Sequence, residues 1–299
     1  MKLSNKTTIL LILAIATILR FFNYFEIPFT HDEFSALFRL NFDSFSELIE
    51  KGVKVDGHPA GIQVFLYYWT TLFGSQEWIV KLPFTLMGII SVFLVYVVGR
   101  KWFNETVGLI SAAYVASIQF TVMYSQIARP YISGIFFSLL MVNFLTNLIL
   151  NPERNFNKNL ALFTVSMSLC TYNHHFSLLF AAIVGITGVF LIQKKYLKKY
   201  LLAGFVVFVL YIPHLKIFFY QLSMGGVEGW LSKPKNDFLI QFIYYIFNYS
   251  PYVIALALSI VLYGLITIKK RAANFKFILI SFLWFILPFL IGFFYSRYV

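Results

Sequence analysis

Charged residues and cysteine are scarce in this sequence. Only 12% of its 299 residues are Asp, Glu, Lys or Arg, whereas 60% are apolar. Soluble domains have about 25% charged residues, so a water-soluble fold of this composition is excluded. Cys170 is the only cysteine. An internal disulfide and a metal site built from several cysteines are therefore excluded as well.

Long apolar runs occupy most of the chain, and the mean hydropathy is +0.77. Each run of about 17 to 20 residues can cross a hydrocarbon core of about 30 Å as a helix. Lipid cannot hydrogen-bond a free backbone, and the alternating pattern of membrane strands is missing. The sequence therefore predicts an all-α integral membrane protein. The first run follows Lys2 and Lys6 and is interpreted as an uncleaved signal anchor.

The basic residues predict the orientation in the membrane. The net charge is +12, and 14 of the 24 Lys and Arg residues lie in five short stretches: 2–6, 100–101, 154–158, 194–199 and 269–276. Short loops rich in Lys and Arg stay in the cytoplasm, so the charge reflects topology and no nucleic-acid partner is expected. All five stretches are cytoplasmic only if the apolar stretch 59–73 does not cross. We predict that it lies on the outer membrane surface as an interfacial helix.

Nine spans are then predicted, in a multi-pass protein of the cell membrane with a cytoplasmic N-terminus. They lie at about 8–25, 82–99, 106–124, 131–150, 160–173, 176–192, 200–217, 251–268 and 277–295. Residues 238–248 are expected to form a second surface helix. We find no repeat or soluble linker, so residues 1–299 are expected to form a single membrane domain.

The first outer loop, residues 26–81, contains eight of the twelve acidic residues. Transporters usually place functional charges within their spans, so this loop favours chemistry at the extracytoplasmic surface. Asp32 and Glu33 directly follow the first span. A carboxylate there can accept a proton from an incoming nucleophile or hold a divalent cation. The alternative is an acidic helix start, with Thr30 or Asp32 as its cap and Glu33 in the first turn.

Two histidine-containing segments are further candidates. Asp56 and His58 precede Pro59 and place a carboxylate and an imidazole near the same interface, although a simple turn before a helix explains them equally well. His174 and His175 lie near the outer end of a span. Adjacent histidines lack metal-ligand spacing, so we expect interfacial hydrogen bonding there and predict no metal site.

Three arginines are candidates for binding a phosphate. Arg129 lies between Tyr124 and Tyr131 at the outer junction of two spans, where its planar fork of donors could clamp a phosphate. Arg297 is expected outside at the end of the chain, and Arg20 is expected in the outer part of the first span. Arg129 and Arg20 could instead be arginines whose charged ends reach the interface.

Taken together, these residues resemble the polyprenyl-phosphate-sugar-dependent glycosyltransferases of the GT-C fold. The similar branch contains the protein O-mannosyltransferases and the lipid A aminoarabinose transferases, that is, glycosyltransferase family 39 and its bacterial relatives. The resemblance is carried by Arg20, residues 32–33, 56–59, 77–83, 99–100, 124–131 and 297–298. It implies a helical bundle of GT-C type with interfacial helices in its first outer loop.

The resemblance also implies an activity. A polyprenyl-phosphate or dolichyl-phosphate sugar would be the donor, and the acceptor, a glycan, lipid or protein, would enter from outside. Asp32 would be the base with Glu33 beside it, and direct displacement would invert the anomeric carbon. Arg129, Arg297 and Arg20 would hold the departing phosphate.

The remaining candidates, Asp56, His58, Tyr124, Tyr131 and His174, would line the substrate site. No cofactor is expected, because Gln126 and Arg129 stand where metal-dependent relatives place a second acidic site.

Relatives generally continue beyond the point that corresponds to Arg297 and Tyr298, so we expect this chain to be a fragment or a minimal core without their C-terminal spans. Two other functions are compatible with the sequence. One is a transporter or flippase for a lipid-linked sugar, and the other is a non-catalytic membrane subunit that binds such a lipid or a partner. The sugar and the acceptor are not predicted.

Overall fold

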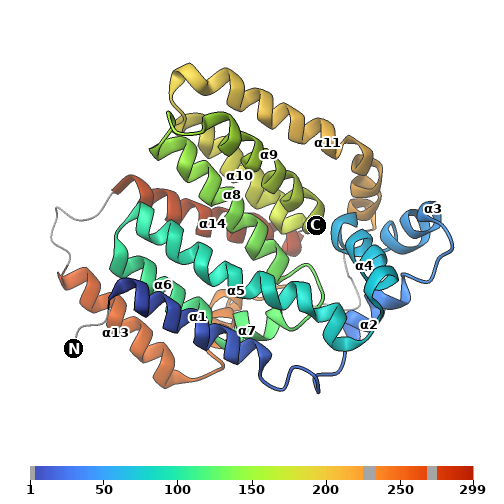
Figure 1. The fold of residues 1–299 in the computed structure, drawn as a ribbon, viewed down its shortest axis with the longest axis horizontal. Coiled ribbons are helices and arrows are strands. Elements are labelled where there is room, and N and C mark those ends of the chain that lie inside the picture. The colour runs from blue at the N-terminus through green and yellow to red at the C-terminus, as the bar shows by residue number, and fades with distance from the viewer. Residues whose placement is uncertain (1–3, 225–232, 268–274, 299) are drawn as a thin grey trace.

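The computed structural model describes residues 4–224, 233–267 and 275–298, and helices are the only regular secondary structure in those residues (Figure 1). The elements, in chain order, are α1 (Asn5–Phe21), α2 (His31–Phe38), α3 (Phe45–Glu47), the π-helix η1 (Leu48–Val53), α4 (Ala60–Phe73), α5 (Glu77–Trp102), α6 (Glu105–Ser117), α7 (Gln119–Ser125), α8 (Ile132–Leu150), α9 (Phe156–Asn173), α10 (His175–Leu191), the 3-10 helix η2 (Lys194–Tyr196), α11 (Leu197–Ser223), α12 (Phe238–Ile246), α13 (Pro251–Thr267) and α14 (Phe275–Tyr298).

Small residues allow the helices of the bundle to approach closely. Helices α5 and α6 cross at Gly99 and Gly108, where a Cβ added to Gly99 would lie 3.1 Å from the Cα of Gly108. Lipid tails are as apolar as leucine, so helices in a membrane associate through such close packing. Buried side chains of α8, α9 and α10 form the largest apolar cluster of the described residues, with Met141, Phe163 and Val184 among them.

A helix stands at each of the nine predicted spans. Four of the helices in the described residues are long and apolar enough to cross a membrane: α5, α8, α11 with the preceding η2, and α14. Counting each of two bent helix pairs as one span raises the number to six. The prediction of a multi-pass helical membrane protein is therefore confirmed, whereas the count of nine stays a prediction.

The predicted span 106–124 is not one continuous helix. It breaks at Ile118 into α6 and α7, which are bent by 61°. The break frees backbone carbonyls, and Arg20 of α1 donates to two of them, Val115 O at 2.9 Å and Ala116 O at 3.0 Å. A buried arginine thus satisfies groups that lipid could not hydrogen-bond. No sequence pattern near Ile118 indicates this break.

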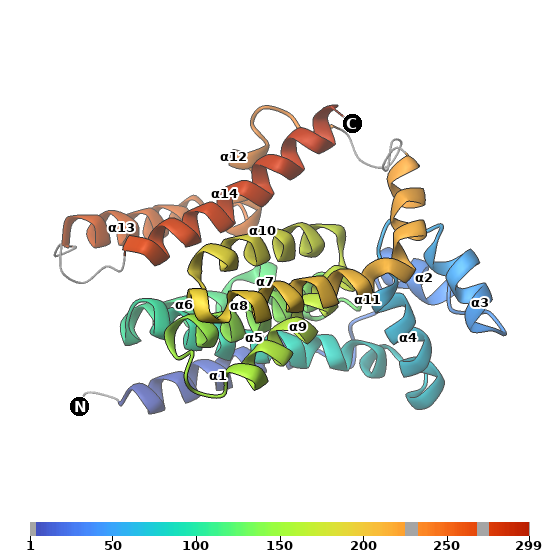
Figure 2. The ribbon, with the colours of Figure 1, turned by 90° about the horizontal axis from the view of Figure 1, so that it is seen from above.

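Helices α2, α3 and α4 lie together at one end of the bundle, here called the α2–α4 end (Figures 1 and 2). The prediction of a helix over 59–73 is confirmed by α4, while its position on a membrane surface stays a prediction. Helix α4 packs on α9 at Gly61, where a Cβ would collide with the carbonyl oxygen of Tyr172. This contact fixes the outer-loop helices against the bundle.

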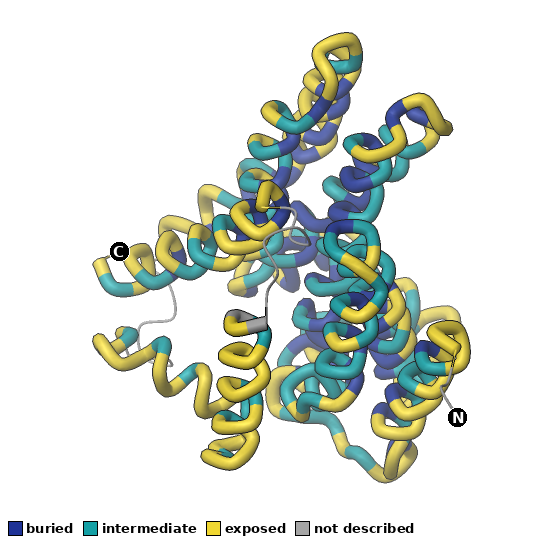
Figure 3. The backbone as a smooth tube through the Cα atoms, turned by 90° about the vertical axis from the view of Figure 1, so that its left-hand side faces the viewer, coloured by how far each residue is buried: buried dark blue, intermediate teal, exposed yellow. Residues whose placement is uncertain are grey.

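Helices α12, α13 and α14 lie along one side of the bundle (Figure 2). The predicted helix at 238–248 corresponds to α12, which is bent by 98° from α13. Helix α14 packs against α10, where Trp284 Nε1 donates to Thr187 Oγ1 at 3.1 Å, and its buried Phe277 stacks on Trp102 of α5. None of the residues of α13 whose burial is described is buried, so its surface is available to lipid (Figure 3).

Candidate active site

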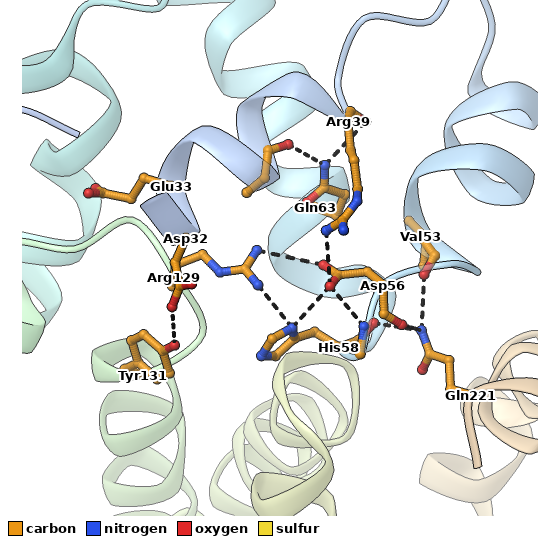
Figure 4. Close-up of polar contacts among 12 residues, drawn as sticks. Asp32, Glu33, Arg39, Val53, Asp56, His58, Gln63, Arg129, Tyr131 and Gln221 are labelled. Atoms are coloured by element: carbon orange, nitrogen blue, oxygen red, sulfur yellow. Dashed lines mark hydrogen bonds and ion pairs between the residues drawn. The ribbon is translucent and has the colours of Figure 1, made fainter. Parts of the chain in front are cut away.

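The candidate site lies where α2, α4 and the turn at residues 54–59 meet the junction between α7 and α8 (Figure 4). Thr30 begins α2 with a capping box: its side chain accepts from the Glu33 N–H, and the Glu33 side chain accepts from the Thr30 N–H. The expected acidic helix start is therefore present, and of the two possible caps, Thr30 and Asp32, it is Thr30 that caps the helix. In this helix start Asp32 is exposed, whereas Glu33 is buried.

Glu33 is buried and fully engaged. Its Oε1 accepts from the Ala128 N–H at 2.8 Å, and its Oε2 accepts from the Thr30 N–H at 2.8 Å. The ammonium of Lys81 lies 3.7 Å from the same carboxylate and donates to the carbonyls of Ile27 and Pro28. The carboxylate thus ties the start of α2 to α5 and to the α7–α8 junction.

Asp32 is exposed, and its Oδ2 accepts a hydrogen bond from the Tyr131 hydroxyl at 2.9 Å. No Lys or Arg of the described residues forms an ion pair with it. Burial, together with the hydrogen bond to Asp32, raises the pKa of Tyr131 to about 12. The phenol therefore stays protonated at neutral pH and continues to donate to the carboxylate, which is open to a reactant.

Asp56 is buried among cations. It lies 3.1 Å from Arg39 Nη1 and 3.6 Å from Arg129 Nη1, and its Oδ1 accepts from the Gly57 N–H at 2.8 Å. Burial alone would raise the pKa of Asp56, but the contact with His58 and the charges of Arg129 and Arg39 lower it to about 2. Asp56 is therefore a permanent anion at neutral pH.

Arg129 connects this anion to His58. Its Nη2 lies 3.0 Å from His58 Nδ1, and the same ring nitrogen lies 3.4 Å from Asp56 Oδ1. Only 5% of Arg129 is exposed, and its Nε is buried without a hydrogen-bond partner. Two arginines face the single charge of Asp56, so the group carries excess positive charge. Figure 4 shows Arg129 beside the Asp32–Tyr131 pair.

Two glutamines that the sequence analysis did not single out position these groups. Gln63 of α4 donates to Ala36 O at 2.7 Å and holds the end of α2. Gln221 of α11 lies within hydrogen-bond distance of three carbonyls in the turn, among them Asp56 O at 2.7 Å and His58 O at 2.9 Å. In the sequence, the only feature that could have indicated these two residues is that each is an amide residue within an apolar helix.

His174 lies beside His58, with their ring centroids 5.1 Å apart. Its Nδ1 accepts from the Phe176 N–H at the start of α10. Burial and neighbouring His58 lower the pKa of His174 to about 3, so its ring is neutral at physiological pH. A neutral ring in this position can exchange hydrogen bonds with a hydroxyl group.

One face of α11 carries polar atoms that are buried without hydrogen-bond partners. They are Tyr211 Oη, His214 Nε2 and Gln221 Oε1. The three side chains are at least nine-tenths buried and follow helical spacing. Because buried polar atoms are nearly always paired, this face fits a water or a polar ligand.

Tyr124 extends the site toward α12. Its ring lies 4.7 Å from that of Tyr131, and its hydroxyl is 3.5 Å from the hydroxyl of Tyr245. Asp32, Tyr131, Tyr124 and Tyr245 thus form a continuous row from α2 to α12.

The three candidate phosphate-binding arginines are not brought together. Arg20 is wholly buried, and its donors are used by Ser125 and by the carbonyls at the α6–α7 break. Arg297 donates to Asn236 and lies over the ring of Phe293. The C-terminal end of α14 stands apart from α2 and α4 in Figure 2. Of the three arginines, Arg129 alone contacts His58 and Asp56.

Comparison with known families explains this arrangement. Fold and site together define a multi-pass helical membrane protein with a polar site at one end of its bundle. The sequence pattern of the dolichyl-phosphate-mannose-protein mannosyltransferase family matches residues 57–217, more than half of the chain. The chain belongs to this family and is a membrane glycosyltransferase of GT-C type. No curated protein and no solved structure matches it.

The matched range contains His58, Tyr124, Arg129, Tyr131 and His174. Asp32 and Glu33 lie before it, and their roles therefore depend on geometry alone. Within the described residues, no group of three or more His, Cys, Asp or Glu side chains is arranged to hold a metal ion.

Proposed function

We propose that this protein transfers a sugar from a polyprenyl-phosphate carrier to an acceptor with inversion of the anomeric carbon, and that Asp32 is the base. One observation carries the proposal: an exposed carboxylate, oriented by a phenol, stands beside a buried arginine that has a donor to spare. The family implies a lipid-phosphate sugar donor and an acceptor. The carrier, the stereochemistry and the base belong to our proposal.

In this mechanism Asp32 takes the proton of the attacking acceptor hydroxyl as its oxygen bonds to the anomeric carbon. The bond from that carbon to the phosphate oxygen breaks, and the carrier phosphate leaves with the electron pair. A phosphate leaves without protonation, so a single carboxylate suffices, unlike the two that glycoside hydrolysis requires. Tyr131 keeps the carboxylate in place through its hydrogen bond.

Arg129 receives the phosphate in this proposal. A guanidinium presents donors in a planar fork that matches phosphate oxygens, and such donors are strongest where water is excluded. The unpartnered Nε and the excess positive charge of the Arg39, Asp56 and Arg129 group support this assignment. We do not assign Arg20 to the phosphate, because Ser125 and backbone carbonyls use its buried donors, nor Arg297, because it contacts Asn236 and Phe293 and not the group of Asp56 and Arg129.

Glu33 is a positioning residue in this mechanism rather than the second reacting carboxylate. His58 and His174 would contact sugar hydroxyls, together with the unpartnered polar atoms of α11. The row of Tyr131, Tyr124 and Tyr245 would line the path of the acceptor or of the lipid chain. The positive-inside pattern supports an active site on the extracytoplasmic side of the cell membrane.

The test is a transfer assay with the full chain in membranes and a panel of polyprenyl-phosphate sugars. We expect turnover with at least one donor, a product of inverted configuration, and loss of turnover in D32N. The matched control is D43N, which removes another exposed acid of the same loop. Retention of configuration, full activity of D32N, or transport of the lipid without transfer would each contradict the proposal.

A further inference from the structure

A polar cavity lies at the opposite end of α5 from the candidate site. Its volume is about 490 Å³, within the range of small-ligand sites of about 300–1,000 Å³. The ends of α8 and α9 line it together with Lys101 of α5. Lys81, which contacts Glu33, is 20 residues earlier on the same helix, so the two ends are about 30 Å apart at 1.5 Å per residue.

The lining contains three cations and no acid. The cations are Lys101, Arg154 and Lys158. None of the ion pairs among the described residues involves any of them. Glu153, the acid next to Arg154 in sequence, instead accepts from Lys195 and from the Tyr196 hydroxyl. The cavity therefore holds three uncompensated positive charges.

Asparagine side chains hold this arrangement in place. Lys101 Nζ donates to Asn143 Oδ1 at 2.9 Å and to Asn147 Oδ1 at 2.7 Å. The Nδ2 of Asn147 then donates to Asn159 Oδ1 at 3.2 Å. Amide oxygens orient an ammonium but do not neutralise it, so the charge of Lys101 stays available to a ligand. Asn151 and Asn155 add further amides to the lining.

We propose that this cavity binds the phosphate ester of an anionic headgroup. Ammonium and guanidinium groups are the donors that phosphate oxygens prefer, and the amides can bond the hydroxyls of a glycerol or sugar moiety. Basic pockets between membrane helices are suited to anionic lipid headgroups. The positive-inside rule predicts that this end is cytoplasmic, so the site is distinct from the transfer site and does not depend on the proposed transfer reaction.

The experiment uses the full chain purified in detergent and measures lipid binding by native mass spectrometry. The probes are phosphatidylglycerol and, as the uncharged comparison, phosphatidylcholine. The test variant is R154Q/K158Q, because both side chains are exposed and their loss leaves the packing of the bundle unchanged. The charge-matched control is K194Q/K198Q, which removes two exposed lysines, one in η2 and one in the first turn of α11.

We expect the chain to prefer phosphatidylglycerol, and the test variant to bind it roughly tenfold more weakly. The control should bind within about twofold of the unaltered chain, because its lysines lie outside the cavity. Equal losses in both variants, or no preference for the anionic lipid, would overturn the proposal. A parallel thermal-shift titration with glycerol 3-phosphate identifies the source: stabilisation that R154Q/K158Q abolishes assigns the site to a soluble phosphate ester, and its absence assigns it to lipid.

Discussion

Asp32 and Asp56 belong to the same outer loop but have opposite surroundings. Asp32 is exposed and its one hydrogen-bond donor is a neutral phenol, whereas Asp56 is buried between Arg39 and Arg129. A carboxylate held between two arginines cannot readily take up a proton, because protonation would leave both cations unpaired. The comparison teaches that a base must be open to its reactant, while a charge that orders a site must be enclosed.

The largest effect is expected from Glu33, which shares the start of α2 with Asp32 but is enclosed like Asp56. Replacing Glu33 by Ala leaves Lys81 buried and unpaired and should lower the free energy of unfolding by about 3 kcal/mol. Thermal unfolding in detergent measures this loss. The double variant E33Q/K81M removes both charges and should recover most of the stability. Failure of that recovery would indicate a role for the charge of Glu33 beyond pairing.

Arg129 is the buried partner of Asp56, and replacing it tests whether this enclosed group binds the sugar donor. In R129K the point charge remains but the fork that reaches His58, Asp56 and a phosphate is lost, so kcat/KM for the donor should fall about 100-fold. Transfer kinetics over a range of donor concentrations measure the change. R39K is the control, since Arg39 is the more exposed partner of Asp56 and should change kcat/KM less. Equal effects of the two variants would contradict the assignment.

Asp56 should make stability depend on pH. Its pKa is about 2 in the folded protein against an ordinary value of 3.8. Because the folded pKa is lowered, the carboxylate stabilises the protein fully above pH 3.8, and this stabilisation is lost as the pH falls through about 2. The loss amounts to about 2 kcal/mol. Melting temperatures of the unaltered chain and D56N, measured by thermal unfolding in detergent, should therefore converge between pH 5 and pH 2. A difference that stays constant over this range would contradict the prediction.

Tyr131 is expected to give the smallest effect. Replacing it by Phe removes one hydrogen bond to an exposed carboxylate, worth about 1 kcal/mol, so kcat should fall roughly fivefold with little change in KM. The control is Y252F, because Tyr252 is an exposed residue of α13 outside the row of Asp32, Tyr131, Tyr124 and Tyr245. A loss in Y131F as large as that in D32N would mean that the phenol takes part in the chemistry directly.

Much of the fold follows from the sequence, because each helix depends on residues that are close together in the chain. Apolar runs of sufficient length predicted helices at α5, α8 and α14, and counting of basic loops led to a non-crossing helix where α4 is found. The break at Ile118 was not predicted. It depends on Arg20 of α1, which is 95 residues before Val115 and supplies the donors for carbonyls that the break releases.

Several of the candidate site residues named from the sequence lie close together in the structure. The loop was found because its acids cluster in sequence, and the His58, Arg129 and Tyr131 candidates lie within one network or beside it. Gln63 and Gln221 were missed, since an isolated amide in an apolar helix gives no sign of the distant carbonyls that it holds. The cavity at Lys101 was missed as well, because the loop charges indicated only topology.

The sequence by itself determined the membrane environment, the helical class and the clustering of acidic residues in the segment 26–81, since composition and local spacing control these properties. The tertiary structure alone decided which of two adjacent carboxylates is free. The Ala128 N–H and Lys81 enclose Glu33 from parts of the chain that are 95 and 48 residues away, and Asp32 is left facing outward. The tertiary structure also decided that Arg129, and not Arg20 or Arg297, contacts Asp56 and His58, because the partners of a side chain depend on how distant helices pack.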